Sequence, residues 1–199
     1  MLSQQIDAQL AERKKWALRR QLGIPPNRGL FILACMDERI SINEILGIHD
    51  GDAHIFRNAG GFVTDDAIRS AMLSTQFCGT KEIIIINHTG CAMLSSSGDS
   101  LVNSLKNKGV DVQGVSINPA LPELTLQDQS KNFAKWMHLV SDIDAACQEQ
   151  IELLKSSPLI PQDVVINGYI WEVESMSLRR PYDSLGKAAA TAQQMAPKK

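Results

Sequence analysis

Two short apolar runs constrain the fold of this 199-residue chain more than any other feature. They are residues 30–34 (LFILA) and residues 83–86 (IIII), and neither contains a polar residue. A short, continuous apolar run is typical of a strand that is buried on both faces of a parallel sheet. Two further strands are predicted at residues 53–56 and 164–173.

Helical patterns separate these predicted strands. Thr64 or Asp65 can cap a helix that runs to about Phe77, because its apolar residues recur at helical spacing. Strands that alternate with helices predict an α/β fold, with a mostly parallel central sheet flanked by helices. Further helices are expected at residues 3–22, 41–46 and 99–108, and one or two within 128–155, interrupted near Ser141.

Length and composition predict one domain over residues 1–199, with residues 1–25 as an N-terminal helical arm and 181–199 as a polar surface tail. The net charge of −2 gives no reason to expect a nucleic-acid or anionic-membrane partner. No apolar run approaches the ~20 residues that span a bilayer. The first 16 residues lack the apolar core of a signal peptide, so we expect a cytoplasmic protein.

Polar residues with ligand chemistry follow three of the predicted strands. Cys35 follows the first run, residues 57–61 (RNAGG) follow the second strand, and His88 and Cys91 follow the isoleucine run. In open α/β sheets the active site lies beyond the carboxyl ends of the strands. We therefore expect these segments to form a single site.

The residues at this edge form a C-x-D-x-R pattern, which begins at Cys35, and an H-x-x-C pattern, which spans His88 to Cys91. Zinc prefers thiolate and imidazole ligands in a tetrahedron, and three protein ligands leave the fourth position for water. No C-x-x-C pair is present, which argues against a redox motif or a zinc ribbon. Cys78 and Cys147 lie in apolar-flanked helical stretches, so we expect them to be core residues.

Asp37 and Arg39 are expected to lie beside the metal ligands. Arg39 can form a bidentate pair with Asp37 and keep its carboxylate ionised and oriented. Asp37 then either accepts a hydrogen bond from a metal-activated hydroxide or occupies the fourth ligand position itself, and the sequence leaves both open. The alternative for the pair is a surface ion pair of little consequence. For residues 57–61, a plain glycine-rich turn and a loop whose backbone lines the site are equally compatible with the sequence.

The other three histidines show no ligand spacing. His49 and His54 are expected at the surface or beside a strand. His138 lies near Trp136, so we expect it to contribute to helix packing.

Taken together, Cys35-x-Asp37-x-Arg39, the RNAGG segment and His88-x-x-Cys91 resemble the signature of β-class carbonic anhydrases. Within that family the chain resembles most the short branch that includes carbon disulfide and carbonyl sulfide hydrolases. The segments that carry this narrower resemblance are WALRRQLGIPPNR, CMDERI, DDAIRSA and GTKEIIIINHT. One departure is Gly90-Cys91-Ala92, because many members carry an acidic residue before the cysteine and a glycine after it.

This resemblance implies a β-carbonic anhydrase-like fold, with Zn²⁺ held by Cys35, His88 and Cys91. It also implies a homodimer or a higher homo-oligomer, with the active site at the dimer interface. The candidates for an apolar wall there are Phe62, Phe77 and Met93.

The implied activity is the zinc-dependent hydrolysis of carbon disulfide or carbonyl sulfide to hydrogen sulfide and carbon dioxide, by attack of hydroxide activated on the metal. Asp37 would orient the hydroxide or accept its proton, and Arg39 would fix Asp37. The first alternative is a carbonic anhydrase that converts carbon dioxide to bicarbonate. The others are a non-catalytic zinc protein or bicarbonate sensor, and a thiol-redox protein using Cys35 and Cys91.

Overall fold

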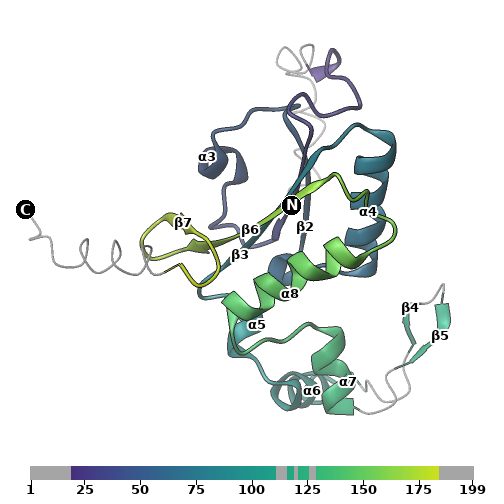
Figure 1. Cartoon of the computed structure of the whole chain (residues 1–199). Coiled ribbons are helices and arrows are strands. Elements are labelled where there is room, and N and C mark those ends of the chain that lie inside the picture. The colour runs from purple at the N-terminus through teal and green to yellow at the C-terminus, as the bar shows by residue number, and fades with distance from the viewer. Residues whose placement is uncertain (1–18, 111–115, 119–120, 126–128, 184–199) are drawn as a thin grey trace, which may run out of the picture.

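A five-stranded sheet forms the centre of the computed structural model, which describes residues 19–110, 116–118, 121–125 and 129–183 (Figure 1). The strand order is β2-β1-β3-β6-β7. Strands β2, β1, β3 and β6 pair in parallel, and only β7 is antiparallel to its neighbour. The predicted mostly parallel sheet is therefore confirmed. The strands are β1 (Leu30–Cys35), β2 (Ala53–Asn58), β3 (Glu82–His88), β6 (Val165–Glu172) and β7 (Ser177–Arg179).

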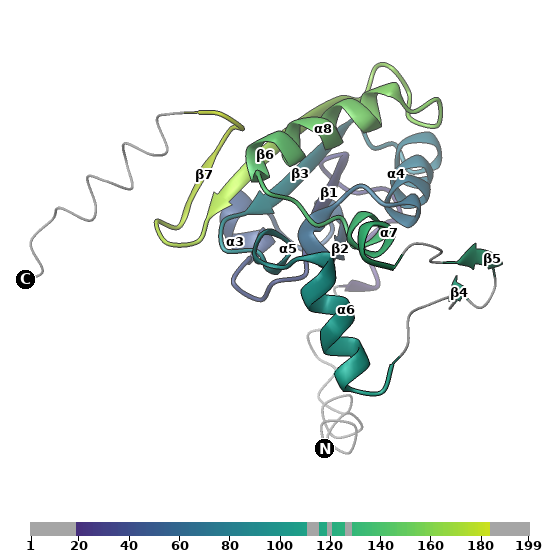
Figure 2. The ribbon, with the colours of Figure 1, turned by 90° about the horizontal axis from the view of Figure 1, so that it is seen from below.

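One face of this sheet is covered by α4 (Asp65–Phe77) and α8 (Ile143–Ser156) (Figures 1 and 2). Alternate residues of a strand point to opposite faces, so the two apolar runs divide their side chains between two cores. The odd-numbered members contribute to the core under α4 and α8: Phe31, Leu33, Ile83 and Ile85. Their burial on this face explains half of each continuous apolar run.

The opposite face packs against the segment that contains α3 (Ile42–Leu46). The even-numbered residues of the same runs point here, and they form a second core with the thiol residues of the predicted site: Leu30, Ile32, Ala34, Ile86, Cys35 and Cys91. All six residues of β1 are buried. Both faces of the sheet are thus covered, as the continuous apolar runs predict.

The remaining elements are a short 3-10 helix after β2 and a group of short helices and strands between β3 and α8. Figure 2 shows α6 and the β4–β5 hairpin extending away from the central sheet. The predicted interruption near Ser141 separates two helices, α7 and α8. The elements are η3 (Ala59–Gly61), α5 (Ala92–Ser95), α6 (Gly98–Asn107), β4 (Ser116–Asn118), β5 (Leu121–Thr125) and α7 (Gln129–Trp136).

The hairpin β4–β5 and the edge strand β7 are not predicted by the sequence. Proline at positions 119 and 122 weakens a strand signal, and the β4–β5 register is irregular. Most of the predicted N-terminal helix, and residues 184–199 of the predicted tail, lie outside the described residues. Among the helices that the structure describes, none has the length and apolar character to cross a membrane.

Candidate metal centre

The ends of β1 and β3 bring the three predicted metal ligands together. Cys35 is the last residue of β1, His88 is the last residue of β3, and Cys91 immediately precedes α5. Strands β1 and β3 are parallel neighbours, so their carboxyl ends lie at the same edge of the sheet. The two Sγ atoms and a ring nitrogen of His88 all lie within 4.8 Å of one another, and all three residues are buried.

The hydrogen bonds of His88 leave one ring nitrogen available for a metal. Nδ1 lies 2.9 Å from the carbonyl oxygen of Thr89, which can only accept, so Nδ1 donates this bond. Nε2 is then an unprotonated acceptor, and it is buried without any hydrogen-bond partner among the described residues. Buried polar atoms are almost always partnered. An orphaned acceptor beside two thiols fits a metal ion that would take its lone pair.

The two thiols influence each other strongly. A hydrogen bond from Cys91 lowers the pKa of the Cys35 thiol well below its usual range. The same contact with Cys35 raises the pKa of Cys91 above its usual range. Without a cation, therefore, the Cys35 thiol ionises more readily than the Cys91 thiol. A divalent cation would favour ionisation of both sulfurs, and two thiolates with a neutral imidazole form a ligand set that suits zinc.

Asp37 and Arg39 form the bidentate pair that the sequence predicts. Arg39 Nε donates to Asp37 Oδ1 at 2.8 Å, and Arg39 Nη2 donates to Oδ2 at 2.6 Å. These hydrogen bonds from Arg39 hold the pKa of the Asp37 carboxyl well below its usual range. Asp37 Oδ2 lies 3.9 Å from His88 Nε2, so an ionised carboxylate borders the cluster of ligand atoms.

Arg57 fixes the backbone that links Cys35 to Asp37, a role that the sequence does not predict. Its Nε donates to the carbonyl oxygen of Cys35 at 2.8 Å, and its Nη2 donates to the carbonyl oxygen of Asp37 at 2.6 Å. One guanidinium therefore spans the turn that carries the first ligand and the carboxylate. The signal was its place at the start of the RNAGG segment, directly after a predicted strand.

The RNAGG segment packs directly against Cys35, the first predicted ligand. Gly61 has φ of +66°, and a Cβ atom placed there would lie 2.5 Å from the backbone nitrogen of Cys35. Only glycine permits this approach, because any side chain would displace the end of β1. Of the two possibilities that the sequence left open, the structure therefore shows a turn whose backbone borders the candidate site.

Two buried amides hold this turn, and both were missed. Asn87 Nδ2 donates to the carbonyl oxygen of Gly60 at 2.9 Å. Gln150 Nε2 donates to Asn87 Oδ1 at 3.3 Å, and Gln150 Oε1 accepts from the backbone of Val63 at 2.8 Å. A polar residue inside a buried strand was a signal for Asn87. For Gln150 the signal was a polar residue on the buried face of a helix.

The proposed wall residues have different positions within this chain. Phe62 is buried, and Met93 packs against the apolar core that contains Cys35. Phe77 ends α4 and is 74% exposed, whereas the start of α4 adjoins the RNAGG turn. Because a 13-residue helix is roughly 20 Å long, Phe77 does not border this chain's own cluster of ligand atoms.

The remaining histidines and cysteines are accounted for separately. Cys78 and Cys147 are buried, as expected of core residues. His138 packs against a neighbouring side chain, but from outside the helices, because α7 ends at Trp136 and His138 follows it with φ of 53°. Its ring stacks on Phe62 at a centroid distance of 5.8 Å, and burial lowers its pKa. His54, expected beside a strand, lies within β2 and makes hydrogen-bond contacts with Ser74 Oγ (2.8 Å) and the Ile24 carbonyl (2.9 Å).

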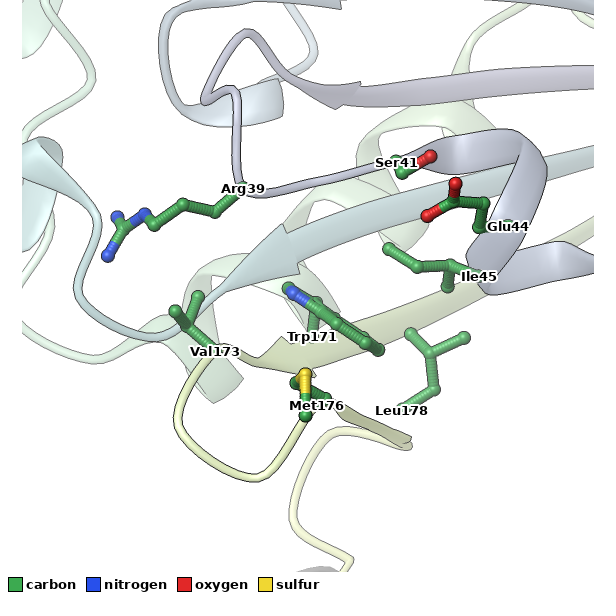
Figure 3. Close-up of a pocket in the computed structure, with 8 residues that line it drawn as sticks. All are labelled: Arg39, Ser41, Glu44, Ile45, Trp171, Val173, Met176 and Leu178. Atoms are coloured by element: carbon green, nitrogen blue, oxygen red, sulfur yellow. The ribbon is translucent and has the colours of Figure 1, made fainter.

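A cavity of about 570 Å³ lies beside the candidate centre and not around it (Figure 3). None of the three predicted ligands lines this cavity. In Figure 3 the guanidinium of Arg39 points away from the other lining side chains, so only its stem faces them. The lining residues are Arg39, Ser41, Glu44, Ile45, Trp171, Val173, Met176 and Leu178.

Comparison with known proteins gives one consistent family. A family model described as carbonic anhydrase matches residues 30–176. A carbon disulfide hydrolase of Acidithiobacillus thiooxidans is 50% identical over 199 residues and covers 99% of each chain. A carbon disulfide hydrolase of Saccharolobus solfataricus is 48% identical over 190 residues and covers 93% of each chain. The solved apo form of a carbon disulfide hydrolase matches with a TM-score of 0.76 and 42% identity, covering 99% of this chain and 97% of that one.

The family match includes every residue that the sequence placed at the site. Its span contains the two cysteines, the histidine and the Asp37–Arg39 pair. The family is metal-dependent, and among the described residues Cys35, His88 and Cys91 form a group that could hold a metal ion. This chain is therefore an enzyme of the β-carbonic anhydrase family.

Proposed function

We propose that this enzyme hydrolyses carbon disulfide, carbonyl sulfide or both to hydrogen sulfide and carbon dioxide, with Zn²⁺ held by Cys35, His88 and Cys91. The observation that carries the metal chemistry is the buried Nε2 of His88, which faces two thiols and has no partner among the described residues. The relatives named carbon disulfide hydrolase, at about 50% identity over nearly the whole chain, support the substrate class.

The reaction needs a nucleophile and a group that manages its proton. When bound, zinc would act as a Lewis acid and lower the pKa of a water molecule towards ~7. Asp37 then acts as the hydrogen-bond acceptor: its Oδ2 atom, ionised because of Arg39, orients the attacking oxygen or takes its proton. Arg39 holds both carboxylate oxygens, so Asp37 presents Oδ2 in one orientation.

Each turnover consumes one water and breaks one carbon–sulfur bond. The water oxygen bonds to the electrophilic carbon, and the electron pair of the broken bond leaves with the sulfur. The sulfur then takes up protons and departs as hydrogen sulfide. Carbon disulfide gives carbonyl sulfide in the first round, and carbonyl sulfide gives carbon dioxide in the second. No oxidant or reductant is required.

The surroundings of the ligands favour an uncharged substrate. Cys35 and Cys91 belong to an apolar core with Ile40, Ile86 and the partly buried Met93. Moving an uncharged linear molecule into such surroundings costs little hydration energy, whereas moving bicarbonate costs much more. This difference supports the sulfur compounds over carbon dioxide hydration, which produces an anion.

The test is an assay of the purified zinc-loaded protein with all three substrates. We expect hydrogen sulfide from carbon disulfide or carbonyl sulfide, and slow or undetectable hydration of carbon dioxide. Rapid hydration of carbon dioxide without hydrogen sulfide from the other two would show a carbonic anhydrase instead.

Asp37→Asn separates an enzyme from a non-catalytic zinc protein. We expect its activity to fall by at least 100-fold while one zinc per chain remains bound, because the amide keeps the shape but loses the ionised acceptor. Undiminished activity would exclude the role proposed for Asp37. Absence of turnover in the unmodified protein with all three substrates would favour the sensor or structural alternative.

Assembly as a homodimer or a larger homo-oligomer belongs to the same proposal. Strand β2 is an edge of the sheet, and the apolar side chains near it are well exposed: Ile24 (80%), Ile55 (44%), Leu73 (55%) and Phe77 (74%). Exposed apolar residues gathered beside an unpaired strand edge are typical of an interface between chains. Sedimentation analysis of the zinc-loaded protein tests this, and a monomer at micromolar concentration would contradict it.

A further inference from the structure

The turn between β6 and β7 places a carboxylate close to the Asp37–Arg39 pair, although nothing in the sequence motifs marks it. This residue is Glu174. Its Oε2 accepts a hydrogen bond from the hydroxyl of Thr89 at 2.9 Å. The same hydroxyl accepts from the backbone nitrogen of Val173 at 3.0 Å. Thr89 lies between the predicted ligands His88 and Cys91, so the hairpin is joined to the loop that carries two ligands.

Arg39 and Glu174 both lie beside Gly90. A Cβ atom placed at Gly90 would lie 3.7 Å from Arg39 Nη1 and 3.9 Å from Glu174 Oε1. The two charged groups therefore lie near the same point beside Gly90, and the charge of Arg39 contributes to lowering the pKa of Glu174. They are not in direct contact, and their attraction acts through a short gap.

The hydrogen bonds of Arg39 explain what this second carboxylate adds. Asp37 accepts from Nε and Nη2, and the Gly90 carbonyl also accepts from Nη2 at 3.1 Å. Nη1 is the guanidinium nitrogen that faces Glu174. The side chain of Arg39 is 44% exposed, and exposed arginines sample many rotamers unless several contacts restrain them.

We propose that Glu174 is a positioning residue for the reaction: together with Thr89 it restrains the guanidinium of Arg39 from the side opposite Asp37, and so fixes the orientation of the Asp37 carboxylate. The charge of Glu174 is maintained, because hydrogen bonds from its own backbone and from Thr89 lower its pKa. The β6–β7 hairpin, far from the ligands in sequence, thereby becomes part of the support of the site. Only the expected effect on kcat rests on the proposed function.

The test compares Glu174→Gln with Glu174→Asp, and uses Glu149→Gln as the matched control. Glutamine keeps the size and can still accept from Thr89, but it removes the negative charge facing Arg39. Glu149 is exposed on α8, where the same substitution removes one charge outside the site.

The kinetic readout is measured with whichever of the three substrates the unmodified enzyme turns over. Substituting residues that orient the groups around a metal typically costs 10–100-fold in activity or affinity. We therefore expect Glu174→Gln to lower kcat about tenfold with KM and zinc content unchanged, Glu174→Asp to restore part of the loss, and Glu149→Gln to have no effect. If kcat of Glu174→Gln stayed within twofold of the unmodified enzyme, the proposal would be overturned. It would also be overturned if the lower activity of Glu174→Gln came with loss of zinc or with a lowered melting temperature.

A second readout does not depend on turnover. Nitrogen-15 NMR of the zinc-loaded protein reports hydrogen exchange at arginine Nε, and the buried Arg179 serves as an internal reference. We expect Glu174→Gln to raise the exchange rate at Arg39 several-fold and to leave Arg179 unchanged. Unchanged exchange at Arg39 would refute the positioning role. If the unmodified enzyme turned over none of the three substrates, the proposed function would fail while this measurement still decided the role of Glu174.

Discussion

Gly61→Ala tests whether the glycine turn is required for the position of the first metal ligand. Two costs follow from the structure. A φ of +66° places alanine in the left-handed region, at about 1–2 kcal/mol. Its Cβ would also lie 2.5 Å from the backbone nitrogen of Cys35, about 0.9 Å inside the 3.4 Å at which ordinary contact begins.

That overlap is between a Cβ atom, which is fixed to its own backbone, and backbone atoms of Ala34 and Cys35, so no flexible side chain can relieve it. Relief requires the turn or the end of β1 to move, at a cost of about 1–3 kcal/mol. We therefore expect Gly61→Ala to lower the free energy of unfolding by about 3 kcal/mol. Because Cys35 would shift with its backbone, we also expect zinc affinity to fall by tenfold or more.

Gly79→Ala provides the matched control. Gly79 has φ of +74°, but a Cβ there would meet nothing within 4 Å, so only the backbone cost of about 1–2 kcal/mol applies. Urea denaturation of the metal-free proteins, with zinc titrations of each, measures both quantities. Equal destabilisation of the two variants, with equal zinc affinity, would refute the argument that the close approach to Cys35 matters.

Three further predictions concern the supports of the site. Arg179→Met removes the cation that pairs with the largely buried carboxylates of Asp144 and Glu172. Urea denaturation should therefore show that the free energy of unfolding falls by about 3–5 kcal/mol. A fall of less than about 1 kcal/mol would contradict this expectation. Asn87→Leu removes the hydrogen-bond donor to the glycine turn, so we expect the free energy of unfolding to fall by about 1–3 kcal/mol and zinc binding to weaken. Unchanged zinc binding would count against the role of the amide. Arg39 lowers the pKa of Asp37 below its ordinary 3.8, so this ion pair stabilises the fold above about pH 5, and its contribution is lost as the pH falls. The difference in free energy of unfolding between the metal-free protein and Asp37→Asn should therefore narrow from pH 5 to pH 2. A difference that stays constant over this range would refute the assignment.

The central sheet and the meeting of the ligands could be predicted because both depend on local patterns. The runs at residues 30–34 and 83–86 are short and apolar throughout, which is typical of strands that are buried on two faces. Once the strands are parallel, their carboxyl ends must share an edge, and Cys35 and His88 follow from that geometry. The bidentate Asp37–Arg39 pair is similarly local, since its members are only two positions apart.

The supports of the site depend on tertiary packing and leave little local signal. Asn87 and Gln150 meet although they are 63 positions apart in the sequence, and each looks like an isolated polar residue in an apolar element. Glu174 lies 85 residues from its partner Thr89, in a turn whose position depends on the pairing of β6 with β7. The end of α7 before His138 was not predicted, because helix propensity does not fix where a helix ends.

X-ray absorption at the zinc edge of freshly purified protein tests the central claim most directly. Two thiolates and one imidazole, with room for water, predict two sulfur atoms at ~2.3 Å and one nitrogen at ~2.0 Å around each zinc, with one further light atom. The sulfur signal should fall by half in Cys91→Ser. A zinc with no sulfur neighbours or with four of them, or a purified active protein without zinc, would contradict the account.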